Sequence, residues 1–314
     1  NSPEDIEKLT RYAHLYNAKV YITLNTILFD HELEAAERLA VRMYEAGADA
    51  LIIQDMAYLE MNLPPIALHA STQTNNYQPD KVRFLERAGF SRIILARELT
   101  LQQIMEIRKE TTAGLEFFVH GSLCVSLSGR CYLSYAIGGR SANRGACAQP
   151  CRRKYSLTDN DGKIIEADKH LLSLKDLNLS ENIKELADAG IDSLKIEGRL
   201  KDAAYVKNIT SFYRQKTDQV IENDNSYFRP SAGRIYCGFT PNPAKSFNRG
   251  STDYFLHGRN REITSFDTPK SLGEAIGTVK NVSHEWFEVD SATPISNNDG
   301  LVFIDRKGET VGIK

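Results

Sequence analysis

The chain has 314 residues, of which 41% are hydrophobic and 25% charged, and its formal net charge at pH 7 is −2. This composition is typical of a globular protein with a sizeable core, and the near-neutral charge excludes attraction of anions by overall charge, so any affinity for nucleic acid must come from a local patch. No apolar run approaches the ~20 residues of a membrane helix, and no secretory signal peptide is recognisable. We therefore expect a cytoplasmic protein with no membrane contact.

Short β-rich stretches alternate with amphipathic helical patterns through the first two thirds of the chain. After an opening helix, strands are predicted at 19–25, 48–55, 66–73, 91–99, 115–121 and 191–198. Helices are predicted at 30–47, 79–89, 100–111, 179–190 and 201–221. This alternation indicates a parallel sheet with helical crossovers. Because no strand precedes the opening helix, we expect an α/β fold built on a TIM-like (β/α) barrel that lacks its N-terminal unit.

The chain divides into three predicted regions. Residues 1–222 form the (β/α) barrel core, with a cysteine-rich insertion at 120–155. Turn residues dominate 223–271, which predicts an irregular linker or extension. Short alternating stretches from 272 to 314 predict part of a small, β-barrel-like module.

The insertion at 120–155 contains four of the five cysteines of the chain, namely Cys124, Cys131, Cys147 and Cys151. Four thiolates are the donor set of a tetrahedral zinc site or of a 4Fe–4S cluster. Only the last pair is tightly spaced, whereas zinc ribbons prefer two tight pairs, so the spacing favours a cluster and leaves zinc as the alternative. Buried, unliganded thiols are a further alternative, and Cys237 is either an ordinary thiol or a replacement fourth ligand in place of Cys151.

The same insertion is strongly basic, since no Asp or Glu occurs between Phe117 and Thr158. Such a stretch favours binding of phosphates or carboxylates. The alternatives are a solvated surface or screening of a negatively charged cluster. The candidate substrate-binding residues of the insertion are Arg130, Arg140, Arg144 and Arg152.

Two further groups of polar residues follow predicted strands. His69 ends a strand, the position where barrel enzymes place their chemistry, and Gln73 would line the same mouth. Lys195, Glu197 and Arg199 alternate, so they share one strand face. This row would either clamp a dicarboxylate or form an internal ion-pair network, with Glu98 and Glu116 as potential partners.

His120 and Cys124 would form a nucleophile–base dyad only if the chain turns between them, because residues i and i+4 of a strand are about 13 Å apart. His120 is otherwise a polar residue at a strand end. The sequence contains no GxSxG and no HExxH motif.

Several long motifs resemble the signature of peptidase family U32, over about residues 10–260. The main motif consists of Glu116, Phe118, Gly121, Ser122, Leu123, Cys124, Gly129, Cys131, Leu133 and Ser134. It is extended by "GRSANRGACAQPCRRKY", "IDSLKIEGRLK", "LHASTQTN" and "FNRGSTDYFLHGR". The resemblance implies a TIM-like barrel. It also implies a 4Fe–4S cluster on the four cysteines and oxygen-independent hydroxylation of a ribosomal or transfer RNA base, with prephenate as oxygen donor.

We therefore predict a cytoplasmic iron–sulfur RNA hydroxylase whose partners are RNA and a small dicarboxylate. Its candidate catalytic residues are His69, His120, Lys195, Glu197 and Arg199. The first alternative is a collagenase-like peptidase, as the family name implies. The second is a non-catalytic RNA-binding or scaffolding protein with a structural metal.

Overall fold

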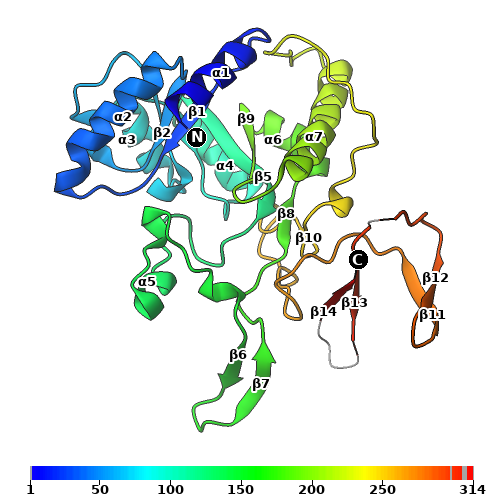
Figure 1. The fold of residues 1–314 in the computed structure, drawn as a ribbon. Coiled ribbons are helices and arrows are strands. Elements are labelled where there is room, and N and C mark those ends of the chain that lie inside the picture. Colours follow the sequence, from blue (N-terminus) through cyan, green and yellow to red (C-terminus); the bar gives the residue numbers. More distant parts are fainter. Residues whose placement is uncertain (1, 298, 306–309, 314) are drawn as a thin grey trace.

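The computed structural model describes residues 2–297, 299–305 and 310–313, and its centre is one mixed sheet (Figure 1). The sheet contains β1 (Tyr21–Leu24), β2 (Ala50–Ile53), β3 (Ala67–Ala70), β4 (Phe90–Ile94), β5 (Gly114–Ser122), β8 (Asp176–Asn178), β9 (Ser193–Ile196) and β10 (Ser251–Thr252). Six of these strands, β1 to β5 and β9, correspond to the six predicted from the sequence, which confirms the α/β class.

The strands from β1 to β5 pair in chain order, and every one of these pairs is parallel. β9 joins β5 in parallel, while β8 pairs antiparallel with the far end of β5 and carries β10. In the described part of the chain, no strand pairs with the outer edge of β1, so the sheet is open. The predicted (β/α) barrel, expected to lack its N-terminal unit, is not confirmed and stays a prediction.

Helices accompany the strands, as the sequence pattern predicts; α1 precedes β1, and only a 3-10 turn at Met56–Leu59 lies between β2 and β3. They are α1 (Pro3–His14), α2 (Leu33–Glu45), α3 (Pro79–Arg87), α4 (Leu101–Lys109), α6 (Ile183–Asp188) and α7 (Ala203–Asn223), and α5 (Leu133–Gly138) lies in the cysteine-rich insertion. Capping boxes start α1 at Ser2 and α4 at Thr100. No helix of the described ranges is both long and apolar enough to cross a membrane.

The two faces of the sheet differ in chemistry because successive strand residues point to opposite sides. In β5, Leu115, Phe117 and Val119 belong to the hydrophobic core, together with Ile104 of α4 and Leu186 of α6. The alternate residues of the same strand are Glu116, Phe118 and His120. We call the side of the sheet that carries Glu116 and Phe118 the polar face.

Two short strands of the sheet were not predicted. β8 has three residues and β10 has two, which is too short for a periodic pattern. β10 lies within 223–271, so part of that predicted linker belongs to the central sheet.

Three hairpins stand apart from the central sheet. The hairpin of β6 (Tyr155–Thr158) and β7 (Ile164–Lys169) extends beyond the cysteine-rich insertion (Figure 1). The C-terminal region contains one hairpin of β11 (Gly277–Val282) and β12 (Phe287–Ser291) and another of β13 (Leu301–Ile304) and β14 (Thr310–Ile313). The predicted small β module is thus present as separate hairpins, and the predicted domain boundaries stay a prediction.

Candidate active site on the polar face of the sheet

His69 lies buried on the polar face, on β3, with only 4% of its surface exposed. Its ring packs edge-on against Tyr21 of β1, with ring centroids 4.6 Å apart. Burial, together with the nearby positive charges of Arg92 and Lys195 and against the opposing charge of Glu116, lowers the pKa of His69 to about 4. The imidazole is therefore neutral at pH 7, which is the state required of a general base.

Glu116 is the centre of an ion-pair network beside His69. Its carboxylate accepts from the Lys195 ammonium at 2.9 Å and from the Ser193 hydroxyl at 3.0 Å. The Arg92 guanidinium lies 3.7 Å from the same carboxylate. Lys195 and Glu116 are thus paired, as expected for an internal network.

Arg97 extends this network toward the carboxyl end of β9. Its guanidinium donates to Glu197 at 2.9 Å and stacks over Phe118, with 3.9 Å between the guanidinium carbon and the ring centroid. Arg199 turns away and donates to the backbone carbonyl of Gly145, in the cysteine-rich insertion, at 2.9 Å. Of the three residues predicted to form one row, Lys195 and Glu197 therefore join the network, whereas Arg199 binds the insertion.

Glu98 does not join the row as the sequence suggested. It accepts instead from the backbone N–H and the hydroxyl of Ser128, both at 2.9 Å. This carboxylate holds the insertion in place.

Unsatisfied polar atoms concentrate in this region. The buried side-chain atoms of the described residues that lack a hydrogen-bond partner are Gln54 Oε1, His69 Nδ1, Gln73 Oε1, Asn75 Oδ1, Arg92 Nε and Arg97 Nε. All six residues lie on β3 and β4 or directly after β2, β3 and β4. Buried polar groups are normally hydrogen-bonded, so this concentration indicates a place where a ligand or ordered water supplies the missing partners.

The cysteine-rich insertion is fastened to the same strand ends. Asn75 donates to the backbone carbonyl of Ser128 at 2.9 Å. Gly129, at φ +74°, approaches the backbone carbonyl of Gln73 so closely that any Cβ would collide with it. Gln73, proposed to line the mouth, therefore lies directly under the insertion.

The four cysteines of the insertion interact electrostatically. Burial, with a smaller contribution from the neighbouring Cys131 and Cys151, raises the pKa of Cys124 to about 11. Burial also raises the pKa of Cys151, with further contributions from Cys147 and Cys131. The four thiols thus form one group on the insertion.

The thiol group has the donors of two kinds of metal centre. In number and kind, four thiols match a 4Fe–4S cluster and equally a tetrahedral zinc ion. Among the residues that the structure describes, no three or more His, Cys, Asp or Glu side chains are arranged to hold a single metal ion. The choice between cluster and zinc stays a prediction.

The four candidate arginines of the insertion fall into two pairs. Arg144 forms a bidentate pair with Glu32 at 2.7 and 2.9 Å, and Arg152 donates to Ser173, Leu174 and Leu123. Arg130 and Arg140 are exposed. Of the four candidates, Arg144 and Arg152 are therefore engaged with other parts of the protein, whereas Arg130 and Arg140 present their charge at the surface.

His120 is buried by α7 rather than placed beside Cys124. Its ring nitrogen Nδ1 lies 3.3 Å from the hydroxyl of Tyr213, and its ring also contacts Tyr205. Burial lowers the pKa of His120 to about 4. Within the described residues, no hydrogen bond joins His120 to Cys124, so the hypothesised dyad does not form.

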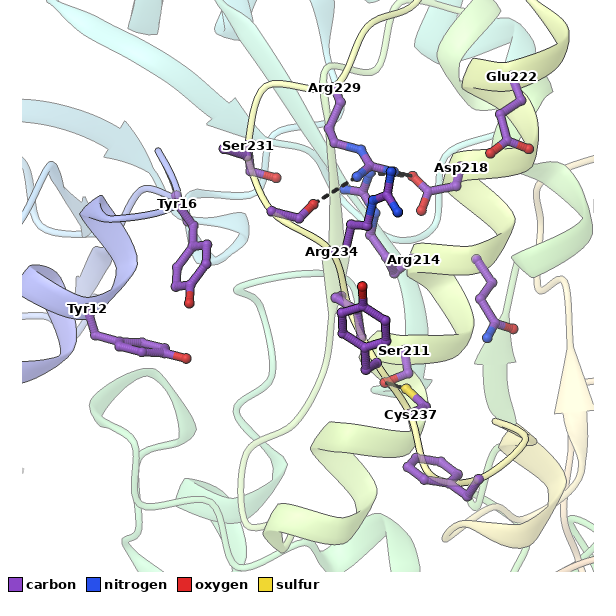
Figure 2. Close-up of a pocket in the computed structure, with 17 residues that line it drawn as sticks. Tyr12, Tyr16, Ser211, Arg214, Asp218, Glu222, Arg229, Ser231, Arg234 and Cys237 are labelled. Carbon is purple, nitrogen blue, oxygen red and sulfur yellow. Dashed lines mark hydrogen bonds and ion pairs between the residues drawn. The ribbon is translucent and has the colours of Figure 1, made fainter.

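Cys237 lies apart from the insertion, on the wall of a cavity of about 870 Å³ between α1, α7 and residues 229–239. Figure 2 shows its thiol against Ser211, to which it donates at 3.2 Å. In the same cavity, Arg214 and Arg229 both pair with Asp218. Cys151, not Cys237, is thus the cysteine grouped with the others.

Arg92 and Arg97 were missed by the sequence analysis, although both lie in the strand predicted at 91–99. A charged residue inside an otherwise apolar strand was the available signal, because arginine is almost never buried without a partner.

Together these features define an α/β protein in which a thiol-rich insertion is held against the polar face of a parallel sheet. A family model described as peptidase family U32 matches residues 1–265. The chain belongs to peptidase family U32.

Three relatives illustrate the range of the family. The chain is 49% identical over its whole length to the 23S rRNA 5-hydroxycytidine C2501 synthase of Escherichia coli strain K12, of which it covers 48%. It is 34% identical to tRNA hydroxylation protein P1 of Bacillus subtilis strain 168, over 71% of this chain and 55% of the relative. A collagenase of Porphyromonas gingivalis strain W83 is 32% identical, over 83% of this chain and 65% of the relative. The chain thus spans between about half and two thirds of each relative.

Proposed function

We propose that the protein is an oxygen-independent RNA hydroxylase, acting in the cytoplasm on a base of ribosomal or transfer RNA. The observation that carries the proposal is the thiol group of the insertion, fastened beside a buried polar face that has unsatisfied atoms. The names of the relatives from Escherichia coli and Bacillus subtilis support the choice of RNA as substrate. The sheet has one apolar face packed on helices and one polar face, as the wall of a (β/α) barrel would, which supports that fold.

Cys124, Cys131, Cys147 and Cys151 would hold a 4Fe–4S cluster, which supplies electron transfer or a Lewis-acidic iron when bound. The chain's own residues provide the rest of the site. Neutral His69 accepts a proton at its free Nδ1. A small dicarboxylate such as prephenate would lie on the polar face, where its carboxylates would accept from the Nε–H groups of Arg92 and Arg97. Both of these groups lack a hydrogen-bond partner.

Anaerobic purification of the full-length protein tests this proposal. We expect about four irons and four sulfides per chain. Cys131→Ala should abolish iron binding, whereas Cys237→Ala, the matched control outside the thiol group, should keep it. RNA mass spectrometry should show one hydroxylated base missing from a deletion strain, restored by Cys237→Ala but not by Cys131→Ala. The purified reaction should require prephenate. A colourless protein with one zinc, and unchanged RNA in the deletion strain, would overturn the proposal.

Peptide hydrolysis is the second candidate, favoured by the collagenase relative from Porphyromonas gingivalis. Its nucleophile would be Cys124, which in the described residues has no hydrogen bond to His120, because His120 contacts Tyr213 instead. Casein cleavage that is lost in Cys124→Ser but independent of iron would support this candidate. RNA binding without any change of the RNA would instead indicate a scaffolding protein with a structural metal.

A further inference from the structure

A second hollow, of about 970 Å³, lies between the start of α7 and residues 239–247. Residues Leu200 to Asp202, which connect β9 to α7, form its edge. Tyr205, on its wall, donates through its hydroxyl to the backbone carbonyl of Glu197 at 3.3 Å. The hollow is therefore directly connected to the residues that follow β9 at the candidate active site.

Three lysines line this hollow from both walls, namely Lys201, Lys207 and Lys245, against one carboxylate, that of Asp202, which accepts from the backbone N–H of Tyr205 at 2.8 Å. Within the described ranges of the chain, none of the three ammonium groups forms a salt bridge with a carboxylate. This differs from the cavity of Figure 2, where Arg214 and Arg229 share Asp218. Unpaired cations in a concave surface attract anions more strongly than the same cations on a convex one, because the cavity focuses their field.

Aromatic rings accompany the lysines. The Lys201 ammonium lies 3.2 Å from the ring centroid of Phe247, and that of Lys207 lies 5.5 Å from the ring centroid of Phe239. Phe239 keeps 40% of its surface exposed, and Leu200 at the rim keeps 87%. Exposed rings next to cations are the features with which proteins bind single-stranded nucleic acid, since phosphates contact the cations and bases stack on the rings.

We propose that this hollow binds a single-stranded stretch of RNA next to the base that is modified. Lys201, Lys207 and Lys245 contact its phosphates, and Phe239 stacks on an unpaired base. This inference rests on the proposed function in taking RNA as the substrate. It goes further in assigning RNA binding to a basic hollow outside the cysteine-rich insertion.

The test measures RNA binding by the full-length protein, using fluorescence anisotropy and a labelled single strand of about a dozen nucleotides. Each phosphate contact contributes about −0.7 to the slope of log K against log salt. Lys207→Gln and Lys245→Gln should therefore each reduce that slope by about 0.7, and each should weaken binding roughly two- to fivefold. Phe239→Ala should weaken binding about tenfold and leave the slope unchanged.

Lys109→Gln is the matched control, because Lys109 is an exposed lysine on α4 outside the hollow. Wild-type affinity and slope in both lysine variants and in Phe239→Ala would overturn the inference. So would calorimetry in which the lysine variants lose binding of prephenate but not of RNA, because the hollow would then be a small-anion site.

These experiments distinguish a failure of the proposed function from a failure of the inference about the hollow. RNA binding that depends on the hollow, in a protein that leaves RNA unmodified, supports the inference and overturns the proposed function. Wild-type hydroxylation and wild-type RNA affinity in the hollow variants overturn the inference alone.

Discussion

The neutral imidazole of His69 makes folding depend on pH. Its pKa is about 4 in the folded protein because of burial, against about 6.5 for an exposed histidine. Between pH 4 and pH 6.5, His69 is protonated in the unfolded chain but neutral in the folded protein. The free energy of unfolding therefore falls as the pH drops from 6.5 to 4. We expect this pH-dependent loss of stability to be smaller in His69→Gln than in wild type, by about 1–3 kcal/mol.

Urea denaturation at pH 7 and pH 5 measures this effect. His120 titrates in the same direction but is present in both proteins, so the difference between them isolates His69. His284→Gln, in an exposed position, should leave the pH profile unchanged. Equal loss of stability between the two pH values in wild type and His69→Gln would contradict the assignment of a neutral, buried histidine.

The positions of individual candidate residues were predictable where they lie toward the ends of strands in the sequence. His69 lies on β3, Lys195 on β9 and Glu197 directly after β9, and the structure gathers them near Glu116 and Arg97. Their role in catalysis stays a prediction. Arg144 could not be assigned in this way, because its partner Glu32 is 112 positions away in the chain. A sequence shows that an arginine is present but not which distant carboxylate neutralises it.

At the scale of elements, the insertion depends on one close contact with the loop after β3. Alanine at Gly129 would place a methyl group against the backbone carbonyl of Gln73 and would also occupy a left-handed backbone conformation. We expect a loss of stability of about 2–4 kcal/mol, or release of the insertion with reduced iron binding.

Gly138→Ala is the control, since a Cβ at Gly138 in α5 meets no atom within 4 Å. Thermal denaturation and iron content should be close to wild type for this variant. A Gly129→Ala protein with wild-type stability and full iron content would show that the close contact does not position the insertion.

Long helices and strands could be predicted from the sequence, whereas very short strands could not. The six parallel strands and their helices follow from alternating and helical periodicity. β8 and β10 carry three and two residues and are defined by pairing partners far along the chain, such as Ser251 opposite Asp176. The barrel was predicted from the alternation of strands and helices and from the family resemblance, and neither determines whether the two edges of a sheet meet.

At the scale of the whole molecule, the segment after α7 is attached to the central sheet by a buried ion pair. Arg249 and Asp176 are 8% and 4% exposed, and their charged groups are 2.9 Å apart. Arg249 also donates to the backbone carbonyl of Pro269 at 2.7 Å. This pair therefore connects β8 of the sheet with the segment that contributes Lys245 and Phe247 to the second hollow.

Arg249→Met should destabilise the protein by about 3–5 kcal/mol, because it leaves the Asp176 carboxylate buried without its counter-charge. Changing both partners, Arg249→Met with Asp176→Leu, should restore a part of this loss, since no uncompensated charge then remains. Arg38→Met, which removes an exposed pair with Glu34, should be indistinguishable from wild type in the same urea titration. If Arg249→Met matched Arg38→Met, the buried pair would not hold the segment. Loss of the ion pair would then leave RNA affinity unchanged. If the pair does attach the segment, both the stability and the RNA affinity of Arg249→Met should fall.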